Sequence, residues 1–307
     1  MHMIIEDQHA WAVILAGGDG TRLKPLTRLI SGDARPKQFC PIFSGRSLLA
    51  DTRSRLAPVV ADLRTLFSVR KAHERYWAGD LSDVDRHRIL VQPSNKGTAA
   101  GIASAVLSIL EQDPDAVICF VPCDHYYDDD AQFQATIGSV FAAATHDPSS
   151  VILLGATPYY PETEYGWIQP VDSSECSRIA RFWEKPSLEN ARELLDHGYL
   201  WNTFVMAGHA TVFLELLENC IPQFPATFRS ILRSGLESRR SRRLYRALEA
   251  VDFSQQVLSN STDRLKVLRL KDARWSDLGK PERVMATLAA AGIQPNWAVA
   301  LGHKATA

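Results

Sequence analysis

The chain has 307 residues, of which 46% are hydrophobic, and its formal net charge is −1. This length and composition allow one large domain or two modest ones with a well-buried core. The neutral balance argues against a nucleic-acid or membrane-surface partner. No apolar run approaches the roughly 18 residues of a membrane span, and the first residues lack a secretory-signal pattern. Five scattered cysteines without a CxxC pair favour reduced thiols and a cytoplasmic location.

The first half of the chain alternates between strand-like and helix-like segments. Short apolar runs at 11–16, 65–69, 88–93, 116–122 and 151–156 predict buried strands. Helical spacing predicts helices at 47–57, 98–112 and 132–145, the second with Thr98 as its N-cap. This alternation predicts a parallel sheet covered by helices, with right-handed crossovers.

The pattern changes after about residue 158. Shorter strand candidates at 165–170, 178–186, 201–207 and 265–270 are accompanied by helix candidates at 188–197, 211–219, 240–250 and 281–291. An arginine-rich run at 239–246 is typical of a solvated helix face. No repeat or long linker divides the sequence. We predict a single domain over 1–307, with a nucleotide-binding half at about 10–157 and a substrate-covering half at about 158–292.

A glycine-rich loop follows the first predicted strand. In LAGGDGTRLKPLTR (15–28), three glycines precede an arginine, a lysine and a second arginine. Ligands of open α/β sheets bind beyond the carboxyl ends of the strands. Glycines let backbone N–H groups approach an anion, and Arg22 and Lys37 would add positive charge. The loop matches neither the Walker A pattern nor GxGxxG, so it predicts another kind of phosphate cradle.

Two aspartates and a Glu-Lys pair follow later strand ends. Asp124 in VPCDHYY comes directly after a buried strand, and Asp277 lies in RWSDLG. Carboxylates at a sheet edge suit a magnesium ion that bridges phosphate oxygens. The structural alternatives are that each aspartate is a turn residue or helix cap, and that Glu184 and Lys185 form an exposed ion pair. Taken together, these residues predict a phosphoryl- or nucleotidyl-transfer site that works by positioning and charge neutralisation.

Nine motifs occur in the order seen in sugar-1-phosphate nucleotidyltransferases. They are LAGGDGTRLKPLTR, RPKQF, QPSNKGTAAGI, VPCDHYY, EYGWIQP, RFWEKP, LWNTFVMA, VDFSQQVL and RWSDLG. Over roughly 11–290 the chain resembles this family, most closely its mannose-1-phosphate guanylyltransferase branch. The resemblance implies an α/β nucleotide-diphospho-sugar transferase (Rossmann-like) fold, with a mixed, mostly parallel sheet flanked by helices. It also implies Mg²⁺, a possible homodimer, and the conversion of GTP and mannose 1-phosphate into GDP-mannose and pyrophosphate.

The resemblance also implies roles for particular residues, and it makes the second half a sugar-binding half. Nucleotide binding falls to Leu15, Ala16, Gly17, Gly18, Gly20, Thr21, Arg22, Gln92, Asn95, Gly97 and Thr98. Catalysis falls to Arg22, Lys37, Asp124, Lys185 and Asp277, of which Asp124 and Asp277 would hold the metal. The sugar phosphate would meet Gly166, Glu184, Lys185 and Asn202, and Asp252 borders the sugar pocket.

One motif departs from the guanylyltransferase pattern. Guanylyltransferases usually carry Glu-Pro and Arg-Asn-Thr where this chain has Gln92, Lys96 and Gly97. A glutamine offers both a donor and an acceptor, as in the thymidylyl- and uridylyltransferase style of base reading. Another base, or glucose or heptose 1-phosphate as the sugar, is therefore an alternative. A non-catalytic nucleotide-sugar-binding regulator is disfavoured because Arg22, Lys37, Asp124 and Asp277 are all present.

Overall fold

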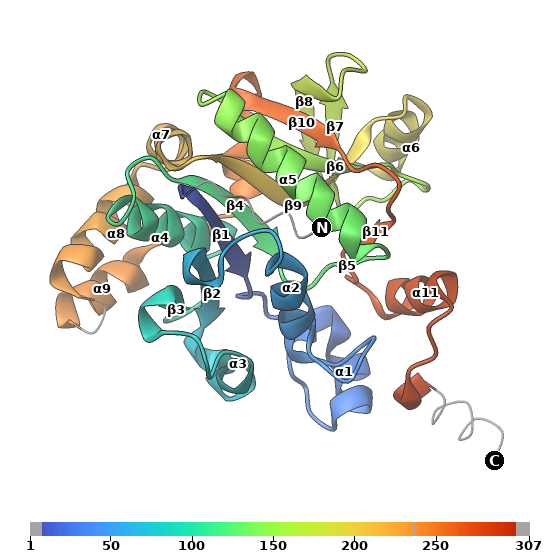
Figure 1. The fold of residues 1–307 in the computed structure, drawn as a ribbon, viewed down its shortest axis with the longest axis horizontal. Helices are drawn as coiled ribbons and strands as arrows, with labels where there is room; N and C mark the ends of the chain where they lie inside the picture. Colours follow the sequence, from blue (N-terminus) through green and yellow to red (C-terminus); the bar gives the residue numbers. More distant parts are fainter. Residues whose placement is uncertain (1–7, 236–237, 299–307) are drawn as a thin grey trace.

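The computed structural model describes residues 8–235 and 238–298, and it is an α/β structure built on one large sheet (Figure 1). The strands are β1 Ala10–Leu15, β2 Thr65–Arg70, β3 Ile89–Gln92, β4 Val117–Pro122, β5 Tyr126–Tyr127, β6 Val151–Ala156, β7 Gly166–Pro170, β8 Cys176–Glu184, β9 Leu200–His209, β10 Leu265–Arg269 and β11 Trp275–Ser276. The helices are α1 Lys24–Ser31, α2 Leu48–Leu56, α3 Glu74–Asp80, α4 Thr98–Leu110, α5 Asp130–His146, α6 Leu188–Asp196, α7 Ala210–Cys220, α8 Gln223–Ser234, α9 Arg239–Ala247, α10 Phe253–Gln256 and α11 Pro281–Ala291. Among them, none is long and apolar enough to cross a membrane.

The large sheet has nine strands in the order β3-β2-β1-β4-β9-β6-β10-β8-β7. Strands β1 to β4 pair in parallel, as do β6 and β10, whereas β8 and β9 run against their neighbours. The predicted mixed, mostly parallel sheet is confirmed. The strand order, which the sequence analysis did not predict, places β9 between β4 and β6, antiparallel to both. Since β9 is buried along almost its whole length, it suits a central position.

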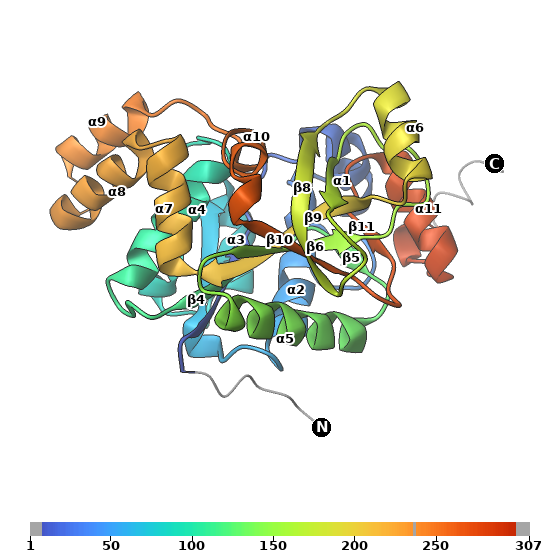
Figure 2. The same ribbon diagram turned by 90° about the horizontal axis from the view of Figure 1, so that it is seen from above.

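The sheet is covered on both faces, which explains the continuous apolar runs of its strands. In β1, Val13 packs into one hydrophobic core, while Ala12 and Ile14 pack into the other. Helices α4, α7 and α8 supply the first core, and α2 and α5 the second (Figure 2). A strand that is buried on both faces has no polar face, so its sequence does not alternate.

Several helices differ from the sequence prediction. The hydroxyl of Thr98 does not cap α4; it accepts the backbone N–H of Phe253 at 2.7 Å, and Gly97 occupies the N-cap position. Helix α9 ends at Ala247, three residues earlier than expected. Helices α1, α3, α8 and α10 were not predicted. Helix α10 has only four residues, whereas α8 does carry the helical spacing, with Phe224, Phe228 and Ile231 buried on one face.

Two long-range contacts place the end of the chain beside the glycine loop. A third hydrophobic cluster joins α1 to α11 through Leu23, Leu26, Leu278, Val284 and Leu288. In addition, β11 pairs antiparallel with β5, with Ser276 opposite Tyr126. This small sheet brings the segment after Asp124 against the segment before Asp277, although the two aspartates lie far apart in sequence.

Candidate active site

Lys37 joins the two aspartates that were predicted to share a metal ion. Its ammonium group lies 3.4 Å from Oδ2 of Asp124, and it donates a hydrogen bond to the backbone carbonyl of Asp277. His125 adds a further contact, with Nε2 3.8 Å from Oδ1 of Asp124. The structure therefore gathers Lys37, Asp124 and Asp277 at one place, at the carboxyl end of β4.

The hydrogen bonds that the described residues make to the Asp277 carboxylate all fall on one of its two oxygens. Its Oδ1 accepts from the Tyr165 hydroxyl and the Gly279 backbone N–H, both at 2.8 Å, and from Arg283. No described residue hydrogen-bonds to Oδ2. Burial alone would raise the pKa of Asp277, but the positive charges of Lys37 and Arg283 outweigh it and hold the pKa at about 2. The carboxylate thus stays ionised.

Arg283 is the centre of a buried ionic network that the sequence did not reveal. Its guanidinium contacts Asp277, Glu162 and Glu164, and its side chain is only 8% exposed. It also lies 4.7 Å from the centre of the Tyr165 ring. Both glutamate partners come from the PETEYGW segment before β7, in which only the glycine had been singled out. A buried arginine paired with several carboxylates fixes them in one geometry.

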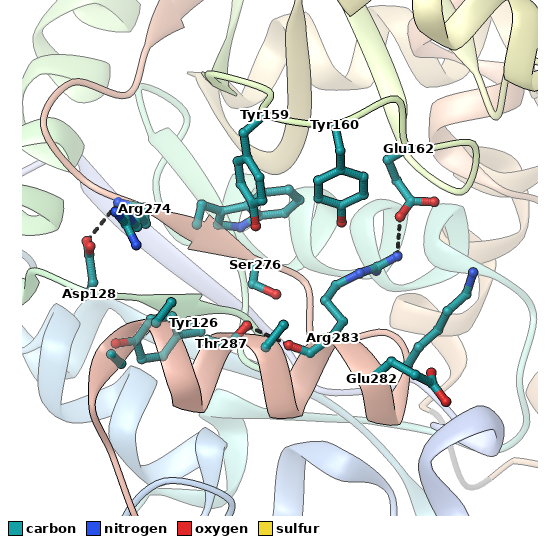
Figure 3. Close-up of a pocket in the computed structure, with 15 residues that line it drawn as sticks. Tyr126, Asp128, Tyr159, Tyr160, Glu162, Arg274, Ser276, Glu282, Arg283 and Thr287 are labelled. Carbon is teal, nitrogen blue, oxygen red and sulfur yellow. Dashed lines mark hydrogen bonds and ion pairs between the residues drawn. The ribbon is translucent and has the colours of Figure 1, made fainter.

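A cavity of about 560 Å³ lies behind Arg283 and is lined by none of the predicted site residues that the structure describes. Figure 3 shows Tyr159 and Tyr160 on one wall and α11 on the other, with the Arg283 guanidinium directed at Glu162. Arg283 therefore separates this aromatic cavity from the Asp277 carboxylate.

The glycine loop is fixed through its carbonyl groups. The side-chain amide of Gln38 donates to the carbonyls of Ala16 at 3.2 Å and Gly18 at 2.7 Å. Gly20 adopts a φ of 55°, and a Cβ there would lie 3.0 Å from the backbone nitrogen of Lys37, so a glycine is required. Within the described residues, nothing accepts the N–H groups of Gly17 and Gly18. Unpaired N–H groups in a rigid turn are suited to bind an anion.

Two adjoining cavities collect most of the predicted nucleotide residues. A cavity of about 370 Å³ is lined by Leu15, Gly17, Gly18, Gln92, Asn95, Gly97 and Thr98, together with Asp124 and Asp252. A second cavity of about 270 Å³ is lined by Gly20, Thr21, Arg22, Lys37, Asn95 and Asp124. Asn95 and Asp124 line both. Arg22 itself is half exposed and pairs with Glu164. Ala16 and Asp277 lie behind these surfaces.

The residues that depart from the guanylyltransferase pattern are partly explained by packing. Gly97 has a φ of 80°, and a Cβ there would lie 2.1 Å from the carbonyl oxygen of Val251. The Lys96 ammonium donates to the carbonyls of Arg246 and Leu248 at the end of α9. These contacts dock residues 95–99 against residues 246–253 and bring Asp252 to the cavity wall. Of the three departures, Gln92 and Gly97 line the cavity, and Gln92 is the one that has a polar side chain to offer a ligand.

The predicted sugar residues form a separate group near Asp252, which lines the cavity of about 370 Å³. A Cβ on Gly166 would lie 3.2 Å from Oε2 of Glu184 and 3.3 Å from Cβ of Asn202, so these three positions are in close contact. The Lys185 ammonium pairs with Glu184 at 2.8 Å. Lys185 adopts a φ of 50°, which is strained for a residue with a side chain and is typical of functional sites. None of the four lines the two cavities described above.

In the described ranges, no cluster of three or more histidine, cysteine or acidic side chains is placed to hold a metal ion. The candidate metal donors are the two carboxylates of Asp124 and Asp277, both of which lie next to Lys37. Mg²⁺ suits such a set, because it usually binds through one or two carboxylates plus substrate phosphates and retains several waters.

A model of the nucleotidyl transferase family matches residues 11–291. The chain belongs to the nucleotidyl transferase family. It is 31% identical over 277 residues, 87% of its length, to the xanthan biosynthesis protein XanB of Xanthomonas campestris pv. campestris (strain B100), and covers 57% of that protein. It is 28% identical to the mannose-1-phosphate guanylyltransferase ManC of Salmonella typhimurium, covering 90% of this chain and 59% of that protein.

Among solved structures, the nucleotidyl transferase fold is found in a protein named mannose-1-phosphate geranyltransferase from Thermus thermophilus. The match has a TM-score of 0.79 and 30% identity, and covers 91% of this chain and 80% of that one. The resemblance read from the motifs and the predicted fold are both confirmed. This chain spans somewhat over half the length of XanB and ManC.

Proposed function

We propose that this nucleotidyl transferase joins GTP and mannose 1-phosphate to form GDP-mannose and pyrophosphate. The observation that carries the proposal is the convergence of the glycine loop, Lys37, Asp124 and Asp277 at one sheet edge. The similarity to ManC supports the choice of substrates. We further propose that the protein works in the cytoplasm and forms a homodimer.

In the proposed reaction, an oxygen of the sugar phosphate attacks the α-phosphorus of the nucleotide. The bond from that phosphorus to the bridging oxygen breaks, and pyrophosphate leaves with the electron pair. The N–H groups of Gly17 and Gly18 would hold phosphate oxygens, and Arg22 and Lys37 would neutralise the departing pyrophosphate. Lys185 would bind the sugar phosphate and direct its attacking oxygen, while Gly166, Glu184 and Asn202 contact the sugar.

Asp124 and Oδ2 of Asp277 would hold Mg²⁺ at the α-phosphate. When bound, the ion supplies charge neutralisation for the phosphate oxygens. The structure offers a fit for it, because Arg283, Tyr165 and Gly279 occupy only Oδ1 of Asp277. No third side chain is required, since water and phosphate oxygens complete an octahedral set.

The proposal is tested by offering the purified protein, with Mg²⁺, five nucleoside triphosphates against several hexose 1-phosphates. Pyrophosphate release is measured for each pair, with folding checked by circular dichroism. Highest turnover with GTP and mannose 1-phosphate is the expected result. Higher turnover with another pair would overturn the substrate assignment, and silence of the folded protein across the grid would favour a regulatory homologue.

A further inference from the structure

The side-chain amide of Gln92, at the end of β3, lies in the wall of the nucleotide cavity of about 370 Å³. A Cβ built on Gly101 would lie 3.0 Å from Nε2 of Gln92, and one built on Gly17 would lie 3.5 Å from the same atom. Both glycines line the cavity, so one arm of the amide borders the space that a ligand would fill. Whether that arm is an NH₂ donor or a carbonyl acceptor decides which edge of a base it can bind.

Two hydroxyl groups contact the Gln92 amide, one on each arm. Nε2 lies 2.9 Å from Oγ of Ser68, and Oε1 lies 3.3 Å from the hydroxyl of Tyr245. Ser68 also lines the cavity, whereas Tyr245 does not. Tyr245 comes from the arginine-rich helix α9, is only 2% exposed, and packs its ring edge-on against Phe228. The arginine-rich segment thus delivers one buried tyrosine to the back of the cavity.

The hydroxyl of Tyr245 has one proton and two neighbouring acceptors. The backbone carbonyl of Ser94 lies 2.9 Å away, closer than Oε1 of Gln92 at 3.3 Å. A carbonyl oxygen can only accept a hydrogen bond, so the Tyr245 hydroxyl donates its proton to the Ser94 carbonyl. The tyrosine oxygen then offers its lone pairs to the Gln92 amide. Burial raises the pKa of the Tyr245 hydroxyl, which keeps its single proton in place.

A half-turn of the Gln92 amide satisfies every group in this network. Nε2 would then donate to the Tyr245 oxygen, and Oε1 would accept the Ser68 proton, for which no described residue competes. Amide and hydroxyl orientations are set by the hydrogen bonds available to them. The carbonyl of Gln92 then borders the cavity between Gly17 and Gly101.

We infer that Tyr245 is a positioning residue that turns the Gln92 carbonyl toward the nucleotide cavity and thereby sets its base preference. An acceptor at this position suits a base that presents an amino group, and we assign the Gln92 carbonyl to the 2-amino group of guanine rather than to its ring N–H. Lys96 supports the arrangement by holding the carbonyls of Arg246 and Leu248 at the end of α9. The inference rests on the proposed function and explains how a glutamine can serve a guanylyl transfer.

The test compares the affinity of wild-type protein and Tyr245→Phe for GTP and for ITP, which lacks the 2-amino group. Phenylalanine keeps the ring packing and removes only the hydroxyl. We expect the preference for GTP over ITP to fall about tenfold, the equivalent of one hydrogen bond of ~1.4 kcal/mol. The affinity for ITP and the KM for mannose 1-phosphate should stay unchanged, which a merely structural defect would not allow.

Ser68→Ala removes the other partner of the amide and should lower the same preference, so it tests the inference independently if Tyr245→Phe fails to fold. Tyr159→Phe is the matched control, because Tyr159 lines the other cavity and is 64% exposed. An unchanged GTP-to-ITP ratio in Tyr245→Phe would overturn the inference while the wild-type enzyme remains active. Absence of turnover in the wild type would instead overturn the proposed function.

Discussion

The two sides of the candidate active site are built in different ways. On the glycine-loop side, each group follows directly from a strand end: Gly17 follows β1, Gln92 ends β3, and Asp124 follows β4. On the other side, Asp277 depends on Tyr165 and Arg283, which come from separate segments. The comparison teaches that a parallel sheet positions residues by its own geometry, whereas a carboxylate beyond the sheet needs a dedicated ionic network.

The largest expected effect comes from the two aspartates themselves. Asp124→Asn and Asp277→Asn should each lower turnover at least about 100-fold, the loss typical when a preorganised charge is removed from a reaction site. Steady-state pyrophosphate release at saturating Mg²⁺ measures it. A variant that retained the wild-type rate would show that its aspartate does not hold the metal.

The two aspartate substitutions should also differ in how much they lower the free energy of unfolding. Asp277→Asn removes one of three carboxylates around the buried Arg283, which keeps Glu162 and Glu164, so the cost should be about 1–3 kcal/mol. Asp124 is 22% exposed and has a longer contact to Lys37, so its substitution should cost less than about 1 kcal/mol. Urea unfolding of both variants gives the difference, and equal stabilities would contradict the comparison.

Arg283 should act through Asp277 rather than on the substrate. Arg283→Ala leaves Glu162 and Asp277 without their shared partner, so the Mg²⁺ concentration for half-maximal activity should rise about 10–100-fold, as for other residues that orient metal ligands. Arg283→Lys should recover part of this, because it restores the charge without the planar fork.

A matched control for Arg283 lies on the same network. Lys280 also pairs with Glu164, at 2.9 Å, but its side chain is 42% exposed. Surface ion pairs contribute little, so Lys280→Ala should leave the Mg²⁺ requirement almost unchanged. Titrations of activity against Mg²⁺ for Arg283→Ala, Arg283→Lys and Lys280→Ala rank the Mg²⁺ requirements of the variants. An equal effect of Lys280→Ala and Arg283→Ala would refute a positioning role for the arginine.

On the glycine-loop side, the sensitive position is Gly97. Gly97→Ala should destabilise the protein by at least about 1–3 kcal/mol, because alanine is strained at a φ of 80° and its Cβ would meet the Val251 carbonyl at 2.1 Å. Nucleotide binding should weaken as well, since residues 95–99 separate from residues 246–253. Thermal unfolding and GTP titration measure the two effects.

Gly79 is the control for Gly97. It lies in helix α3, where nothing within 4 Å would meet a Cβ, and Gly79→Ala should stabilise the protein by up to about 1 kcal/mol. If both alanine variants were equally stable, close packing of Gly97 against Val251 would not be what holds this side of the site together.

The smallest expected effect is on the pH dependence of stability and comes from Glu184, one of the predicted sugar-binding residues. Burial raises the pKa of Glu184 above its usual value, and its hydrogen bond to Lys185 only partly opposes this. The folded protein therefore binds this proton more tightly than the unfolded chain. The resulting stability is present below the unfolded pKa of about 4.3 and is lost as the pH rises through the folded value.

Glu184→Gln removes this titration. The variant should show a flatter dependence of unfolding free energy on pH just above about 4.3, by less than about 1 kcal/mol. Urea unfolding at closely spaced pH values measures the slope. A wild-type slope that the substitution left unchanged would assign the dependence to another group.

The sequence by itself determined the nine strands of the large sheet, the glycine loop and the family, but not the short strands β5 and β11. Apolar runs that end near Gly17, Gln92 and Asp124 predict that these residues lie close together, because the carboxyl ends of parallel strands meet at one edge of the sheet. It also predicted most helices, since amphipathic periodicity is a local property. It could not place β9 between β4 and β6, because strand order depends on which buried surfaces fit together rather than on either strand alone.

Only the tertiary structure decided how the two aspartates are held and how Gln92 is oriented. Arg283 and Tyr245 look like ordinary helix residues in the sequence, and Thr98 looks like a helix cap. Their partners lie 121 residues away for the Arg283–Glu162 pair, 153 for Tyr245 and Gln92, and 155 for Thr98 and Phe253. Hydrogen bonds and ion pairs act over a few ångströms of space, and no local pattern records which distant group will be there.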